Sequence, residues 1–127
     1  MIEMTILGQA PSKSNCYGVK CIGTGIKKRA VMYKKAAVKK YERSFISQIP
    51  AKYLNKNIEY YMKVDIDCYY DSRRPDLDNS AKVILDCLQA AGVIKNDNKV
   101  YELNMTKNVR SGGSRVDIRI SESSLGT

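Results

Sequence analysis

The chain has 127 residues and a formal charge of +9, from 22 basic and 13 acidic side chains, and it contains no histidine. A chain of this length forms one domain, and its apolar content of 43% is enough for a core without disulfide bonds. The absence of a membrane-spanning apolar run and of a secretory signal predicts a cytoplasmic protein with no membrane partner. The excess of positive charge favours nucleic acid as the partner.

The four cysteines, Cys16, Cys21, Cys68 and Cys87, form no CxxC pair, which argues against a structural zinc site. We expect Cys68 and Cys87, which fall on apolar faces, to be buried, and Cys16 and Cys21 to be exposed thiols in a reducing compartment. Because histidine is absent, acid–base chemistry has to use carboxylates, lysines, tyrosines or metal-bound water.

The first half of the chain predicts one strand and one helix. Alternating apolar residues predict a strand at Met1–Leu7, and turn-forming residues predict a loop at Gly8–Asn15. Tyr17–Tyr33 is ambiguous and is compatible with two short extended stretches. Lys34–Ile49 predicts a helix, ended by Pro50. Its expected apolar face consists of Ala37, Val38, Tyr41, Phe45, Ile46 and Ile49.

The second half has the clearest periodicity. Every second residue of Ile58–Tyr70 is apolar, which predicts a long half-buried strand. A helix from Asp78 to Ala91 follows, with Gly92 suited to its C-terminal cap. Val100–Thr106 and Arg115–Ile120 predict two further strands joined by a turn. The residues expected to be buried in the helix are Val83, Ile84, Cys87, Leu88 and Ala91.

These elements predict a single α/β (α+β) domain over residues 1–127. We expect a mixed sheet of about four strands with two main helices packed on one face. The long strand leads directly into the acidic start of the second helix. We therefore expect Asp76 and Asp78 to lie at an edge of the sheet.

The most informative segment is the sequence RRPDLDNSAK at residues 73–82. Pro75 favours an extended conformation for the residue before it. In an extended D-x-D segment alternate side chains point the same way, so Asp76 and Asp78 can converge on one point. Carboxylate oxygens are the ligands that Mg²⁺ prefers. Asp97 follows the predicted helix, and it reaches the other two carboxylates only through tertiary folding, since a helix of about 14 residues carries the chain well away.

Basic residues surround the acidic pair. Lys82 lies one helical turn after Asp78 and is placed to contact a scissile phosphate. The helix N-terminus adds a partial positive charge that favours phosphate. Arg73 and Arg74 are placed to bind the DNA backbone.

Each residue also has an ordinary structural interpretation. Capping of the helix is the commonest use of an aspartate at the position of Asp76 or Asp78. Lys82 can pair with Asp78 or Asp86 across one turn, and Asp97 is a common turn residue. A lone D-x-D is a weak signal. The ordered combination D-L-D-N-x-x-K, helix, glycine and acidic turn is far more specific.

With these motifs the chain resembles the RusA-type Holliday-junction resolvases, small endodeoxyribonucleases often encoded by phages and prophages. The resemblance is strongest over residues 73–101, and at one position it departs from the family, because Asn96 stands where an acid is common. The matching segments are Arg74–Asn79 with Lys82 and Asp86, Ala91–Ile94, Asp97–Val100, the opening Ala10–Asn15 with Tyr17, and Gly112-Gly113.

The resemblance implies a homodimer that binds four-way DNA junctions and nicks two opposed strands symmetrically with Mg²⁺, or with Mn²⁺ in its place. Carried over by position, Asp76, Asp78 and Asp97 bind the metal and Lys82 is the catalytic lysine. In-line attack by water would leave a 5′-phosphate and a 3′-hydroxyl. The residues expected to contact DNA are Lys13, Asn15, Arg73, Arg74, Lys82, Lys107 and Arg110.

Two alternatives to junction resolution are open at this point. One is a nuclease of broader specificity that cuts flaps and other branches with the same metal site. The other is a basic, dimeric DNA-binding accessory protein of recombination, in which the acids only cap and solvate. Metal-dependent products separate both nucleases from the accessory protein.

Overall fold

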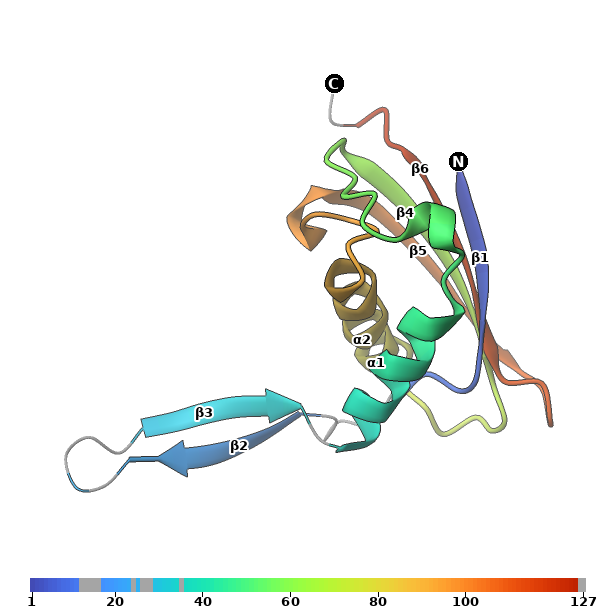
Figure 1. The fold of residues 1–127 in the computed structure, drawn as a ribbon. Coiled ribbons are helices and arrows are strands. Elements are labelled where there is room, and N and C mark those ends of the chain that lie inside the picture. Colours follow the sequence, from blue (N-terminus) through green and yellow to red (C-terminus); the bar gives the residue numbers. More distant parts are fainter. Residues whose placement is uncertain (12–16, 24, 26–28, 35, 126–127) are drawn as a thin grey trace.

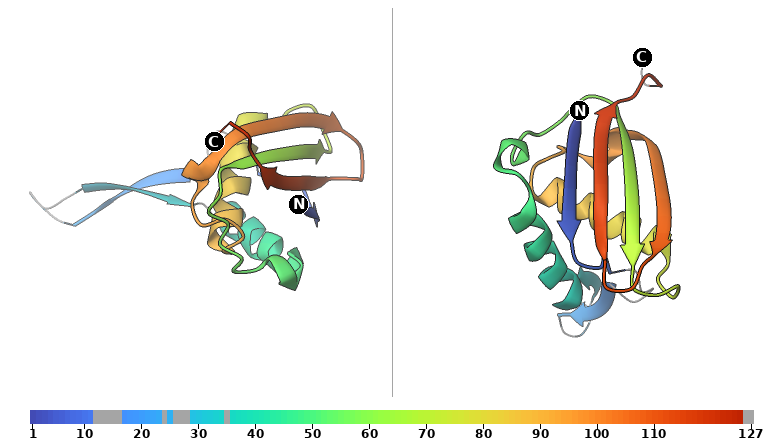
Figure 2. Two further views of the ribbon diagram at one scale, coloured as in Figure 1. Left: turned by 90° about the horizontal axis from the view of Figure 1, so that it is seen from above. Right: turned by 90° about the vertical axis from the view of Figure 1, so that its right-hand side faces the viewer.

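The computed structural model describes residues 1–11, 17–23, 25, 29–34 and 36–125. One four-stranded sheet, in the order β1-β6-β4-β5, carries helices α1 and α2 on one face and leaves its other face open (Figures 1 and 2). The elements are β1 (Ile2–Leu7), β2 (Tyr17–Ile22), β3 (Arg29–Lys34), α1 (Ala36–Gln48), η2 (Ala51–Tyr53), β4 (Met62–Tyr70), α2 (Leu77–Ala90), η3 (Asp97–Lys99), β5 (Val100–Val109) and β6 (Arg115–Glu122). The predicted fold class is confirmed.

Strand β4 lies inside the sheet and explains the strong alternation in its sequence. It pairs parallel with β5 and antiparallel with β6, so both of its edges are hydrogen-bonded. Its inward side chains meet the helices and have no exposed surface, whereas the intervening ones are half-buried on the open face. The inward residues are Met62, Val64, Ile66, Cys68 and Tyr70.

The predicted strand Ile58–Tyr70 was too long. Strand β4 begins only at Met62, and Tyr60 lies exposed. Asn55 and Asn57 both have positive φ, so the chain turns just before Ile58. The Ile58 backbone instead bonds to the segment after α2, donating to the carbonyl of Val93 at 3.1 Å. Apolar alternation therefore begins before the point at which the backbone enters the sheet.

The last two strands are joined by a turn as predicted, but they are not neighbours in the sheet. The turn at Ser111–Gly113 joins β5 to β6, but β4 lies between these strands in the sheet. Strand β5 is reached from β4 through α2 and runs parallel to β4, so β4, α2 and β5 form a crossover unit. Strand β5 is consequently an edge strand.

Strands β2 and β3 form a separate two-stranded sheet, pairing antiparallel from Tyr17 with Lys34 to Ile22 with Arg29. The extended conformation that the ambiguous sequence of Tyr17–Tyr33 allowed is therefore present. Figure 1 shows this ribbon extending away from the sheet and helices.

The two helices bury the faces that their periodicity predicted, with one exception. Val38, Tyr41, Phe45 and Ile49 are buried on or just after α1, but Ala37 lies exposed in its first turn. All five residues expected in the second helix are buried. Burial raises the pKa of Tyr41, whose hydroxyl has no hydrogen-bond partner among the described residues.

Gly92 ends α2 as predicted. Its φ is +72°, and its N–H donates to the carbonyl of Gln89 at 3.0 Å. A Cβ at this position would lie 2.8 Å from Oδ1 of Asn55, so glycine is required both by conformation and by space.

The buried cysteines were predicted correctly. Cys68 and Cys87 are free thiols in the core. Cys16 lies outside the described residues, and only the backbone of Cys21 is described, within β2. In the part of the chain that the structure describes, no helix is long and apolar enough to cross a membrane.

A buried hydrogen-bond chain fastens the end of β4 to the start of α2. The Tyr70 hydroxyl donates to Oγ of Ser80 at 2.7 Å, and Ser80 Oγ donates to the carbonyl of Pro11 at 3.3 Å. Ser80 has no exposed surface. Burial is also the main reason that the pKa of Tyr70 is raised, so the hydroxyl stays protonated and remains a donor.

Replacing Ser80 by alanine should therefore lower the free energy of unfolding by about 1–3 kcal/mol, because the Tyr70 hydroxyl would be left unpaired in the interior. Urea unfolding followed by circular dichroism measures this loss. Adding Tyr70→Phe to Ser80→Ala should recover most of it, since the unpaired donor is then gone. A double variant less stable than Ser80→Ala alone would contradict this role.

Candidate active site

The acidic pair lies at the carboxyl end of the parallel strands β4 and β5. Strand β4 ends at Tyr70, and residues 71–76 lead from it into the first turn of α2. Carboxyl ends of parallel strands meet at one edge of a sheet, where ligand sites commonly form. The helix N-terminus at the same place contributes a partial positive charge.

Asp76 occupies the N-cap position of α2 but does not cap the helix. Its backbone is extended, with φ −96° and ψ 129°, and its side chain makes no capping hydrogen bond. Asp78, in the first turn, accepts a hydrogen bond from the backbone N–H of Asn79 at 2.9 Å. Both side chains are exposed. The capping interpretation therefore fails for Asp76, whose side chain is exposed and makes no capping bond.

The loop before Asp76 is fixed by contacts from distant segments. The ammonium of Lys107, near the end of β5, donates to the carbonyls of Arg73 at 2.7 Å and Pro75 at 2.6 Å. The backbone N–H of Asp71 donates to Oε1 of Gln9 at 2.7 Å. These contacts set the path of the backbone into Asp76.

Lys107 was predicted to contact DNA, and the structure gives its ammonium a second task. Two of its three N–H donors are used by the loop carbonyls, which leaves one for a phosphate. Hydrogen bonds from a charged donor are stronger than those from a neutral one, so these two short bonds fix the loop at this point. Lys107 thus supports Asp76 whether or not it also touches DNA.

Other basic residues lie at the same end of the molecule. Arg73 and Arg74 are exposed in the loop, and Lys82 is exposed one turn into α2. The backbone N–H of Arg110 donates to the carbonyl of Tyr70 at 2.8 Å, so this residue also lies beside the end of β4. Lys13 and Asn15, predicted to contact DNA, lie outside the described residues.

Asp97 lies at the opposite end of α2. Its backbone N–H donates at 3.0 Å to Oε1 of Gln89, which belongs to the last turn of the helix. At 1.5 Å per residue, roughly 16 Å of helix separate Gln89 from Asp78. Figure 1 shows η3 and the loop before α2 at the two ends of the helix. A single chain brings Asp76, Asp78 and Lys82 together, but not Asp97.

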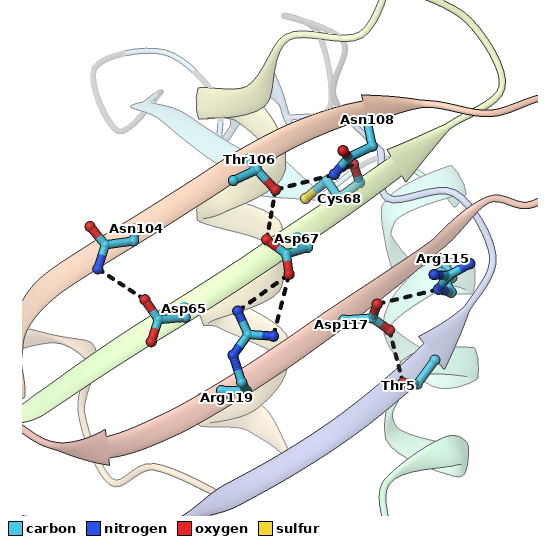
Figure 3. Close-up of polar contacts among 10 residues, drawn as sticks. All are labelled: Thr5, Asp65, Asp67, Cys68, Asn104, Thr106, Asn108, Arg115, Asp117 and Arg119. Carbon is cyan, nitrogen blue, oxygen red and sulfur yellow. Dashed lines mark hydrogen bonds and ion pairs between the residues drawn. The ribbon is translucent and has the colours of Figure 1, made fainter.

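Three further carboxylates share the open face of the sheet, namely Asp65, Asp67 and Asp117 (Figure 3). Each already accepts at least one hydrogen bond or ion pair from a neighbouring strand, so these three carboxylates have partners on this face. Their partners are Asn104 for Asp65 (2.9 Å), Thr106 (2.6 Å) and Arg119 (3.3 Å) for Asp67, and Thr5 (2.8 Å) and Arg115 (3.3 Å) for Asp117. Across the described ranges, no three acidic or thiol side chains are grouped to hold a metal ion.

Sequence reasoning missed the residues that support the site. Gln9, Gln89 and Ser80 position the loop, Asp97 and Tyr70, respectively. Gln9 reaches the loop from a distant part of the chain, whereas Gln89 and Ser80 join neighbouring elements. A glutamine or serine carries no periodic signal of either role. Ser80 alone of the three has a signal in the sequence, because it is a polar residue on an otherwise apolar helix face.

Comparison with known proteins gives the family. The family model for the endodeoxyribonuclease RusA matches residues 19–121. The crossover junction endodeoxyribonuclease RusA of Aquifex aeolicus is 33% identical over 90 residues, which are 70% of this chain and 71% of that protein. The crossover junction endodeoxyribonuclease of Enterobacteria phage HK97 is 40% identical over 52 residues, covering 41% of this chain and 43% of the phage protein. The chain belongs to the RusA family.

If Lys107 holds the loop, Lys107→Met should speed amide hydrogen exchange in residues 71–76 by at least about tenfold, because two hydrogen bonds to a charged donor are lost. Hydrogen–deuterium exchange with mass spectrometry measures this, and Lys56→Met, at an exposed position elsewhere, is the control. Unchanged exchange in the loop of a folded Lys107→Met protein would show that the loop is held by other means.

Proposed function

We propose that this protein is a crossover junction endodeoxyribonuclease that resolves four-way DNA junctions by paired symmetric nicks. The observation that carries the proposal is the Asp76 carboxylate, which stands at the start of α2 without serving as its cap, in a chain of the RusA family. A carboxylate that makes no capping bond, placed among basic residues, fits a site for a cation and a phosphate.

We further propose that Asp76, Asp78 and Asp97 bind the metal, and that it is Mg²⁺, with Mn²⁺ able to substitute. The donors fit this group, because all three are exposed carboxylates and Mg²⁺ is commonly held by one or two of these together with water and substrate phosphate. A bound divalent cation would polarise the phosphate as a Lewis acid and lower the pKa of the attacking water. The chain has no histidine that could activate this water as a general base.

The remaining residues would position the DNA and offset its charge. Lys82 projects from the first turns of α2 beside Asp78, where its ammonium can neutralise charge that develops on the phosphate during attack. Arg73 and Arg74 would bind the backbone on the other side of Asp76. Lys107 and Arg110 extend this surface, and Lys13 and Asn15 are proposed to add to it. The net charge of +9 makes binding sensitive to salt.

A homodimer in the bacterial cytoplasm, from a phage, prophage or cellular gene, is part of the proposal. A junction has two equivalent strands to cut, and a two-fold enzyme offers one site to each. Comparing cleavage of a fixed four-way junction, a flap and plain duplex DNA tests the substrate. Faster cutting of the flap would favour the nuclease of broader specificity, and metal-independent binding without products would favour an accessory protein.

Asp78→Asn should abolish cleavage while leaving junction binding intact. Asparagine keeps an oxygen that can accept the bond from the Asn79 backbone, so the helix start is preserved, but it is a poor ligand for a hard cation. We expect nicking to fall on the order of 100-fold or more, measured with Mg²⁺ on a labelled junction. Undiminished nicking would remove Asp78 from the mechanism.

Lys82→Ala should lower the single-turnover rate by about 100- to 1,000-fold while changing junction affinity far less, because the ammonium acts on charge that forms during reaction. Gel shifts measure the affinity, and Lys56→Ala serves as a control for the loss of one positive charge. A loss confined to affinity would make Lys82 a backbone contact only.

A further inference from the structure

Two tyrosine rings stack at the end of the sheet where β4 and β5 begin. Tyr61 directly precedes β4, and Tyr101 is the second residue of β5. Their ring centroids lie 4.3 Å apart and their planes are tilted by 32°, which is close to an offset stack. Tyr101 nevertheless keeps 48% of its surface exposed. The pair therefore still presents aromatic surface to solvent.

The ladder between β4 and β5 is irregular at this point. Tyr101 is an extra residue of β5 that has no partner on β4, as in a β-bulge. The pairs on either side of it are Met62 with Val100 and Lys63 with Glu102. An extra residue of this kind re-aims a side chain, and such irregularities are common beside active sites. Here the ring of Tyr101 lies against that of Tyr61.

The hydrophobic core does not use these rings. Neither Tyr61 nor Tyr101 belongs to the core, and neither is among the partly buried apolar side chains that pack against it. Exposed apolar residues that are scattered singly need no explanation, but a stacked pair gathers its aromatic surface in one place. Tyrosine is enriched where proteins bind partners. The pair thus has the character of a binding surface.

A lysine gives this surface a positive charge. Nζ of Lys99 lies 4.8 Å from the centre of the Tyr61 ring, which is a cation–π distance. A cation–π contact does not consume an N–H donor, and an ammonium has three of them for oxygen acceptors such as phosphate. Stacked rings beside an ammonium are complementary to a nucleotide, whose base stacks and whose phosphate binds cations.

The tyrosine pair lies close to Asp97 along the chain. The short helix η3 runs from Asp97 to Lys99, and β5 begins at the next residue. Tyr101 therefore follows Asp97 by four residues, which span at most about 14 Å. Stacked bases of one DNA strand are about 3.4 Å apart. A strand whose phosphate lies at Asp97 can thus place a base on the rings within about four steps.

We propose that Tyr61 and Tyr101 form a stacking platform for a nucleobase that has left its stack at the branch point of the DNA, with the ammonium of Lys99 on the neighbouring phosphate. This inference rests on the proposed function and names the part of the substrate that is recognised. A base within a duplex has both faces covered, so it reaches the rings only after unstacking. Unstacking costs least where the stack is already interrupted. The platform therefore favours branched DNA, whereas contacts to phosphates bind any DNA.

Charge favours DNA over a second copy of the chain as the occupant of the platform. Two platforms packed face to face would bring two Lys99 ammoniums together, and like charges repel. The chain as a whole carries +9, and a nucleic acid carries the opposite charge.

Photocrosslinking of the wild-type protein tests the contact directly. A four-way junction carries 5-iodouracil at one strand position at a time, from the branch point outward, and is bound in EDTA so that it is not cut. Irradiation should cross-link a base at or next to the branch point to Tyr61 or Tyr101, as identified by mass spectrometry. The same base in the middle of an arm should not react with them. Cross-links that include neither tyrosine at any position would overturn the platform.

Tyr101→Ala should weaken binding to a four-way junction by about 5- to 100-fold, the usual loss when a stacked base loses its ring, and change binding to plain duplex less than about twofold. Fluorescence anisotropy with labelled DNA measures both affinities. Tyr101→Phe keeps the ring and should bind as wild type does. The matched control is Tyr60→Ala, which removes a 39% exposed tyrosine outside the pair. Equal losses on junction and duplex, or an unchanged junction affinity, would overturn the proposal.

The phosphate contact has its own test. Lys99→Gln should reduce the slope of the logarithm of the junction binding constant against the logarithm of salt concentration by about 0.9, the contribution of one phosphate. A slope equal to that of wild type would overturn the role of Lys99.

Cleavage and oligomeric state separate this inference from the proposed function. Wild type that nicks junctions, with a Tyr101→Ala variant that binds them equally tightly, overturns the platform and leaves the function. Wild type that cross-links through the tyrosines but cuts no DNA with Mg²⁺ supports the platform and overturns the nuclease. Sedimentation equilibrium should give one oligomeric state for wild type and Tyr101→Ala. A change of state would assign the ring to a contact between copies and overturn the proposal.

Discussion

Hydrogen bonding along both edges of β4, together with burial of one of its faces, determines how this molecule is built. A shift of one residue would expose the five inward side chains and bury the polar ones, so the register with β5 and β6 is strongly specified. The fixed register also sets the position at which β4 ends, at Tyr70. The hydrogen bond from Tyr70 to Ser80 then fastens the start of α2, and the acidic pair is placed there.

The helix that presents Asp78 also holds Asp97 away from it. One protomer offers a pair of carboxylates and a supporting lysine at one end, and a single carboxylate at the other.

Periodicity predicted the inward residues of β4 and nearly all of those of α1 and α2, because burial on one face leaves a regular apolar pattern. It failed where the backbone departs from that pattern. Tyr60 fits the alternation although it precedes the sheet strand, which begins only at Met62. The glycine turn after β5 looked like that of a hairpin, yet β4 separates β5 from β6, and sequence adjacency carries no information about an inserted strand. The length of α2 already indicated that Asp97 would lie far from the acidic pair along this helix.

The most direct test of the enzyme as a whole uses a four-way junction labelled in turn on each strand, incubated with wild-type protein in Mg²⁺ or in EDTA and resolved on a denaturing gel. The account predicts nicks at symmetric positions in two opposed strands with Mg²⁺ and none in EDTA. Intact strands in both conditions, from protein that binds the junction, would contradict it.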